Sequence, residues 1–169
     1  MSAMLARDAA EIIEQNIYAA IATVDSDGQP WASPLFVVYD SELNFYWASG
    51  RSSQHSRNIE AQPKVFLTLF DSSVPWGEGR GVYVQALASS VDDLAVIARV
   101  CKLREDRGAN AAQVPDDFTG EYPRRIYKAA PNKLWLNQDM NVHGKFVDGR
   151  IEVDLDAVKL SLGTVRGED

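Results

Sequence analysis

The sequence predicts a mainly β domain (α+β) in which a small antiparallel β-barrel is flanked by helices. Several strand-like runs rich in Ile, Val, Phe, Tyr and Trp follow one another, and turn residues separate them about every ten residues. Helical patterns are few by comparison. Connections this short favour antiparallel neighbours, and a barrel of this kind closes the edges of its sheet.

The composition is that of one globular domain spanning residues 1–169. Hydrophobic residues make up 46% and charged residues 24% of the chain. The formal net charge of -7 argues against a nucleic-acid-binding surface. The only cysteine, Cys101, excludes an intrachain disulfide and fits a reducing compartment. Without a signal-like or membrane-spanning apolar run, we expect a soluble cytoplasmic protein that contacts no membrane.

The N-terminal third predicts one helix and three strands. Leu5, Ala9, Ile12 and Ile13 recur at helical spacing, with charged residues between them. Strand-like runs cover 17–24, 31–39 and 43–48, separated by the turn sequences DSDG and DSE. We therefore expect these three runs to pair in order as a β-meander.

Later elements follow from turns and caps. A short helix is expected from Ser52 or Ser53 to Ala61, and the runs KVFLTLFD and GVYVQALASSV are expected strands. Ser90 and Asp93 resemble a capping box before a helix that ends near Gly108. Two late strand regions follow, RRIYKAAPNKLWLNQ and GKFVDGRIEVDL, the latter a predicted hairpin around 148–149.

The stretch SGRSSQHSRN at 49–58 holds four serines, two arginines and a histidine, and no acidic residue. It lies between a predicted strand and a predicted helix start. The first N–H groups of a helix lack internal partners, so an anion such as phosphate binds well there. The alternative is that Ser52 or Ser53 caps the helix while the basic side chains are solvated. Local spacing leaves both interpretations open.

Two further positions bear on a binding site. Pro34 lies within a strand-like run, and a proline that cannot donate to the ladder indicates an edge or a bulge. Tyr46 and Trp47 are adjacent in a strand and therefore point to opposite faces. One of the two is expected in the core, and the other at a site, at a subunit contact or also in the core.

Other chemistry finds little support. Two histidines and one cysteine cannot build a zinc site of the usual kind, so no metal is expected. No Gly-rich phosphate loop is present. Cys101 is expected in the core. No catalytic acid or base can be named, and His143 is a candidate that fits a surface turn equally well.

Three segments in this order, ATVDSDGQPWASPLFVVYD, LNFYWAS and SSQHSRNIEAQPKVFLTLFD, carry a resemblance to a known family. Over about residues 10–92 the chain resembles the pyridoxamine 5'-phosphate oxidase-like group of FMN-binding split-barrel proteins. The resemblance implies a six-stranded antiparallel split β-barrel. It also implies a homodimer with FMN held at the subunit interface.

The resemblance assigns the expected FMN contacts residue by residue. The isoalloxazine ring would lie along the backbone of a strand made by Ser33, Pro34, Leu35, Phe36 and Val37. The ribityl chain and phosphate would be flanked by Tyr46, Trp47, Ala48 and Ser49. The phosphate itself would be held by Ser53, Gln54, His55 and Arg57, with Arg51 as a further fixed charge.

The chain departs from the family pattern at two places. Members usually carry Arg or Lys where this chain has Gln54 and His55, and the Arg-x-His motif of true pyridoxamine phosphate oxidases is absent. The resemblance therefore implies an FMN-dependent oxidoreductase acting on another small molecule or electron donor. The alternatives are a non-catalytic FMN carrier, a deazaflavin-dependent reductase using Lys64, Arg51 and Arg57, and a cofactor-free dimeric interaction module.

Overall fold

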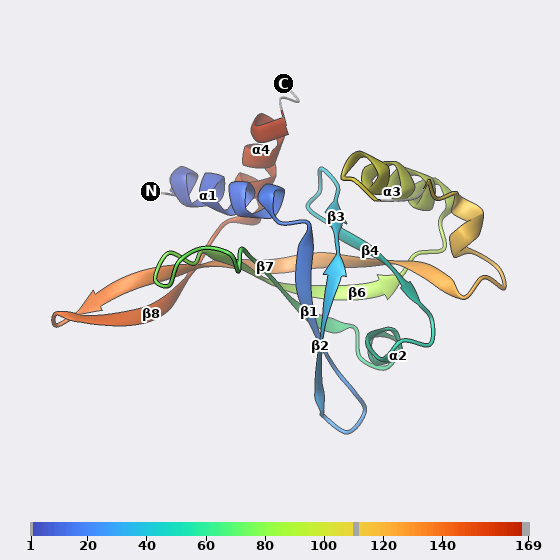
Figure 1. The fold of residues 1–169 in the computed structure, drawn as a ribbon, viewed down its shortest axis with the longest axis horizontal. Helices are drawn as coiled ribbons and strands as arrows, with labels where there is room; N and C mark the ends of the chain where they lie inside the picture. The colour runs from blue at the N-terminus through green and yellow to red at the C-terminus, as the bar shows by residue number, and fades with distance from the viewer. Residues whose placement is uncertain (1, 110–111, 167–169) are drawn as a thin grey trace.

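The computed structural model describes residues 2–109 and 112–166. These residues form one eight-stranded antiparallel sheet with four α-helices and one 3-10 helix (Figure 1). In chain order the elements are α1 (Ser2–Gln15), β1 (Tyr18–Val24), β2 (Pro30–Phe36), β3 (Val38–Tyr39), β4 (Phe45–Gly50), α2 (Gln54–Ala61), β5 (Lys64–Phe70), β6 (Gly81–Ser90), α3 (Leu94–Asp106), η1 (Pro115–Phe118), β7 (Arg124–Val142), β8 (Lys145–Glu152) and α4 (Leu155–Arg166).

The sheet curls because its two end strands are consecutive in the chain. The strand order is β2-β1-β5-β6-β7-β4-β3, with β8 pairing only β7. Phe36 ends β2 at one end of this order and Val38 begins β3 at the other, so Val37 alone connects them. One residue cannot span an open sheet, and the two ends must therefore meet. The predicted antiparallel split barrel is confirmed, with eight strands in place of six because β3 is short and β8 extends an arm.

The core lies inside the curl and beneath the helices. Val65, Leu67 and Leu69 of β5 and Val82 and Val84 of β6 are buried within the main cluster. These side chains therefore belong to the core and are not exposed for contact with a second subunit. A second, smaller cluster packs beneath α3, where Ile97, Val100 and Cys101 meet β3, β4 and η1.

The helices cover the barrel at separate places. α1 packs against α4, and α3 lies over β3 (Figure 1). Arg107, just after α3, ties the two regions together because its Nη2 donates to the carbonyls of Ile13 (2.8 Å), Glu14 (3.0 Å) and Asn16 (3.2 Å). One guanidinium thus satisfies carbonyl groups at the end of α1 that the helix leaves without partners. No helix of the described chain is both long and apolar enough to cross a bilayer.

The predicted meander is wrong in its second half. β1 and β2 form the expected hairpin, with Tyr18 opposite Phe36 and Val24 opposite Pro30. The run 31–39, however, divides into β2 and β3, and β3 pairs with β4 rather than with β2. Barrel closure is the physical reason, because it moves the chain from one sheet end to the other at Val37.

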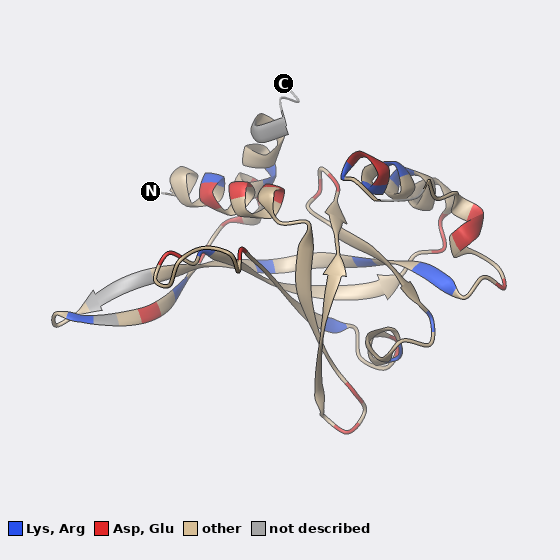
Figure 2. Cartoon of the chain, in the orientation of Figure 1, with Lys and Arg blue, Asp and Glu red and all other residues tan. Residues whose placement is uncertain are grey.

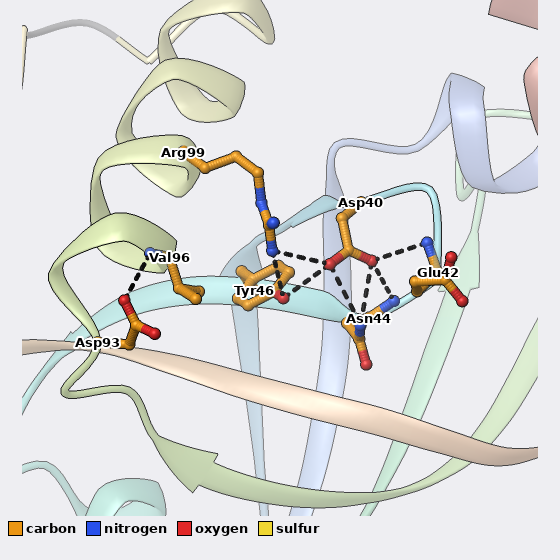
Figure 3. A network of polar contacts seen from close by, with 7 residues as sticks. All are labelled: Asp40, Glu42, Asn44, Tyr46, Asp93, Val96 and Arg99. Atoms are coloured by element: carbon orange, nitrogen blue, oxygen red, sulfur yellow. Dashed lines mark hydrogen bonds and ion pairs between the residues drawn. The ribbon is translucent and has the colours of Figure 1, made fainter.

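Two local predictions also need correction. The hairpin between β7 and β8 turns at His143 and Gly144, whose φ values of 52° and 78° suit a two-residue turn. Asp148 and Gly149 instead lie within β8. Before α3, Asp93 itself is the N-cap, and its carboxylate accepts from the N–H groups of Ala95 and Val96, while Ser90 belongs to β6. The bond to Val96 is drawn in Figure 3.

A buried carboxylate fixes α3 to the β3–β4 turn (Figure 3). Asp40 accepts from the Tyr46 hydroxyl (2.8 Å), the N–H groups of Glu42 and Asn44 (3.1 and 2.9 Å) and the Arg99 guanidinium (3.3 Å). Burial, followed by the hydrogen bond and charge of Asp40, raises the pKa of Tyr46 to about 12. The phenol therefore stays protonated and donates to Asp40 throughout the neutral range.

Replacing Asp40 by Ala is expected to lower the free energy of unfolding by about 2–4 kcal/mol, because it leaves buried donors without an acceptor. Urea denaturation of purified variants measures this change. Arg99→Gln is the matched control, since its half-exposed ion pair contributes under ~1 kcal/mol. Equal losses in the two variants would show that Asp40 does not anchor the turn.

Candidate functional site

The start of α2 is fixed beside β2 and the end of β4. The turn before α2 is held by the Ser53 N–H, which donates to the Gly50 carbonyl (3.1 Å), and by the Arg51 N–H, which donates to Pro123 (2.9 Å). Asn58, one turn into α2, donates to the Thr23 hydroxyl of β1 at 2.9 Å. These contacts place the first turn of α2 at a defined position against the sheet.

No side chain caps α2. Ser53 occupies the N-cap position, but its hydroxyl donates to Ser56 Oγ (2.8 Å) and contacts His55 Nε2 (3.0 Å). The capping interpretation of SGRSSQHSRN is therefore wrong for Ser53. The first-turn N–H groups of α2 receive no side-chain acceptor. Such groups carry partial positive charge and bind anions.

His55 connects three elements of the barrel. Its side chain is buried, with Nδ1 3.2 Å from Ser33 Oγ on β2 and Nε2 2.6 Å from Ser49 Oγ on β4. The predicted residues Ser33, Ser49, Ser53 and His55 are thus brought into one cluster. Burial lowers the pKa of His55, so the imidazole is neutral at pH 7.

One neutral tautomer of His55, with its proton on Nε2, accounts for all of these contacts. Trp31 Nε1 donates to Ser33 Oγ at 3.1 Å, which leaves the Ser33 hydroxyl proton for His55 Nδ1. Nε2–H then donates toward Ser49 and Ser53, and Ser53 donates onward to Ser56. Burial raises the pKa of Tyr127 overall, and Ser56, which lies near it, acts to lower that pKa. A neutral imidazole, with one donor and one acceptor nitrogen, matches this chain.

The basic side chains lie outside the cluster, at the surface of the helix start. Arg51 and Arg57 are both exposed. The Arg57 guanidinium donates to the Ser52 carbonyl and to Gln54 Oε1, the latter at 2.6 Å, and is thereby oriented. Within the described chain neither arginine has an acidic partner within ion-pair distance. Acidic residues gather elsewhere, at the β1–β2 turn and around η1 (Figure 2).

The strand predicted to lie along the ring is an edge strand. β2 stands at one end of the sheet and pairs with β1 alone, and Pro34 is exposed opposite Ala20. The edge position predicted from this proline is confirmed. Leu35 and Phe36 are half-buried, while Val37 is buried and donates its N–H to the Ile17 carbonyl at 2.9 Å.

Tyr46 and Trp47 point to opposite faces, as predicted, and both are buried. Tyr46 belongs to the cluster beneath α3, whereas Trp47 stacks on Tyr127 with ring centroids 5.8 Å apart. Ala48 and Ser49, further along β4, are half-buried, and Ser49 reaches His55. That Tyr46, Trp47 and Ala48 flank a ligand stays a prediction.

Sequence reasoning missed several members of the site. Trp31, Ser56 and Tyr127 extend the His55 cluster, and Asn58 anchors its helix. Ser56 lies within the stretch already singled out. No local signal marked Tyr127, because it lies on β7, far along the chain, and only the folding of the sheet brings it near Ser56. His143 lies at the exposed tip of the β7–β8 arm, and the described residues hold no cluster of metal-ligating side chains.

Known structures share this architecture. The heme storage protein HutZ of Vibrio cholerae superposes with a TM-score of 0.61 at 19% identity, over 77% of this chain and 92% of its own. A Listeria innocua protein provisionally named a pyridoxamine 5'-phosphate oxidase gives 0.60 at 17%, over 83% and 99%. A structure named F420 reductase gives 0.56 at 25%, over 73% and 93%.

The class of protein is therefore an antiparallel split barrel of the kind these structures share. Residues 5–138 match the family described as pyridoxamine 5'-phosphate oxidase, and this chain belongs to that family. No curated protein matches the sequence.

His55 is expected to make stability fall at acidic pH. Its pKa in the folded protein lies below the ordinary value of 6.5, so the unfolded chain binds the proton more readily. The stabilisation is therefore present above pH 6.5 and is lost as pH falls below it. Urea midpoints measured from pH 8 to pH 5 should drop less steeply for His55→Gln than for the unchanged protein. Parallel curves would contradict this assignment.

Proposed function

We propose that the chain is an FMN-binding oxidoreductase whose cofactor phosphate binds at the start of α2. The observation that carries the proposal is the uncapped first turn of α2, with Arg51 and Arg57 exposed beside it. Backbone N–H groups, serine hydroxyls and two guanidinium groups converge there. This donor set suits a phosphate ester.

The edge strand supports the rest of the cofactor. β2 leaves one side of its backbone without a strand partner in the described chain, and its Ser33 is tied to the same His55 that contacts Ser49 and Ser53. The cluster thus holds a strand for the ring and a helix start for the phosphate at a fixed separation. A bound flavin would supply the redox chemistry, and the protein would bind and orient it.

A second copy of the chain is part of this proposal. β2 is an edge strand, and its own Trp31 is large and 49% exposed. Exposed apolar side chains next to an unpaired edge favour coverage by another subunit. We therefore propose a homodimer in which the partner completes the cofactor site and encloses a small substrate or electron donor.

Haem fits these residues less well, although HutZ is a heme storage protein. The chain has only two histidines. His55 is buried with both ring nitrogens in contact with serine hydroxyls, and His143 lies on the tip of the β7–β8 arm. Neither is placed to ligate a metal beside the helix start.

A deazaflavin is the second candidate. The F420 reductase structure shares the fold at 25% identity, and Lys64 is exposed at the start of β5. With Arg51 and Arg57, this lysine would suit a longer anionic tail. The absence of the Arg-x-His motif argues against pyridoxamine phosphate as the substrate in either case.

The visible absorption spectrum of the purified protein, followed by the mass of any released chromophore, is the primary test. We expect two flavin bands and the mass of FMN. A deazaflavin mass would support the second candidate. A colourless protein that takes up neither cofactor would exclude both. Turnover with NAD(P)H or quinones then separates an enzyme from an FMN carrier.

Arg57→Ala is expected to weaken FMN binding about tenfold or more, since a charge-assisted hydrogen bond to phosphate is lost. Fluorescence titration of apoprotein with FMN measures the dissociation constant. Arg7→Ala is the matched control, because Arg7 is an exposed arginine of α1 paired with Glu11. Unchanged affinity in Arg57→Ala would remove the phosphate from this helix start.

A further inference from the structure

Arg104 on α3 is a buried cation without a counter-ion. Its residue is 8% exposed, and no carboxylate of the described chain lies within ion-pair distance of it. The Nη1 atom is buried and makes no hydrogen bond. Burying a charge away from water costs free energy unless the charge is paired. This guanidinium therefore requires an anionic partner, and the described residues do not supply one.

A second guanidinium, that of Arg124, lies close enough to Arg104 to affect it. Burial lowers the pKa of Arg104, and the nearby Arg124 guanidinium lowers it further. Arg124 itself lies over the ring of Phe118, with its Cζ 5.5 Å from the centroid. An arginine still remains charged at neutral pH. An anion bound here would offset the repulsion between these two guanidinium groups.

The guanidinium is oriented by two contacts. Its Nε donates to Gln113 Oε1 at 2.9 Å, and its Cζ lies 5.2 Å from the centroid of the Phe36 ring. The first contact fixes one edge of the planar fork, and the second fixes its plane against an aromatic face. Nη1 is buried and has no acceptor among the described residues.

A hollow of about 450 Å³ lies at this position. Its walls are Ile17, Tyr18, Phe36, Arg104, Gly108, Ala109 and Gln113. Gly108, with a φ of 92°, turns the chain after α3 and opens this side. Tyr18 packs edge-on against Phe36, with ring centroids 6.0 Å apart. Tyr18 and Ile17 are 57% and 41% exposed, so the hollow places the buried guanidinium beside two uncovered apolar side chains.

We propose that this hollow binds a small aromatic carboxylate, whose carboxylate pairs with Arg104 and whose ring covers Tyr18, Phe36 and Ile17. A planar monoanion matches one guanidinium that lies beside two aromatic rings. A phosphate dianion needs more donors than the hollow lines up, and those donors gather instead at the start of α2. The inference stands on Arg104 and its hollow and does not rest on the flavin.

Isothermal titration calorimetry tests this with three probes: benzoate, its neutral isostere benzamide, and inorganic phosphate. We expect benzoate to bind at least about tenfold more tightly than either of the others, because only benzoate combines a ring with a planar charge. In Arg104→Met this preference should disappear. Lys102→Met removes an exposed charge from the same helix and should preserve it.

A second measurement does not depend on the variant folding. In the unchanged protein, benzoate should shift the ring NMR signals of Tyr18 and Phe36. Binding without such shifts, or equal affinity for benzoate and benzamide, would overturn the proposal. Tighter phosphate binding that is lost in Arg104→Met would overturn the carboxylate assignment. The proposal also fails if the unchanged protein does not bind benzoate and Arg104→Met converts a dimer into a monomer of half the mass. The counter-ion of Arg104 would then come from a second copy of the chain.

Discussion

The rest of the structure depends on the connection at Val37. One buried residue joins β2 to β3, the two ends of the curled sheet, and its N–H donates to Ile17 at the entry to β1. A chain constrained in this way cannot keep an open sheet. Closure brings β2 beside the end of β4 and the start of α2. The candidate site exists only because of that approach.

His55 and Asp40 stabilise the closed barrel from opposite faces. His55 joins serines from β2, β4 and α2, while Asp40 collects donors from the β3–β4 turn, β4 and α3. Tyr46 and Trp47, adjacent on β4, direct their side chains to these two faces. Each network is buried and rich in hydrogen bonds. Such networks specify one arrangement only when their members are satisfied.

The two proposed anion sites differ in chemistry. At the start of α2, backbone N–H groups, hydroxyls and exposed arginines are combined, and this mixture of many donors suits a phosphate. At Arg104 a single desolvated guanidinium faces aromatic walls, and this suits a planar carboxylate. Phe36 at the end of β2 lies in the second site, while Ser33 on the same strand belongs to the first. Such a division would let one barrel edge hold a cofactor and a second small molecule.

The sequence by itself determined what depends on neighbouring residues. Runs rich in β-branched and aromatic residues predicted β1, β5 and β6, Pro34 predicted an edge or a bulge, and SGRSSQHSRN marked the turn and the start of α2. Only the tertiary structure decided that 31–39 divides at Val37, and that Ser33, 22 residues away in sequence, meets His55. It also decided that the Ser53 hydroxyl bonds to the side chains of His55 and Ser56 and not to the backbone N–H groups of the first helical turn. The tertiary structure further decided that Arg104 is buried with no acidic partner among the described residues. Local sequence patterns predict turns, strands and helix starts, because these depend on residues close together in the chain. Burial and long-range contacts depend instead on how the sheet closes.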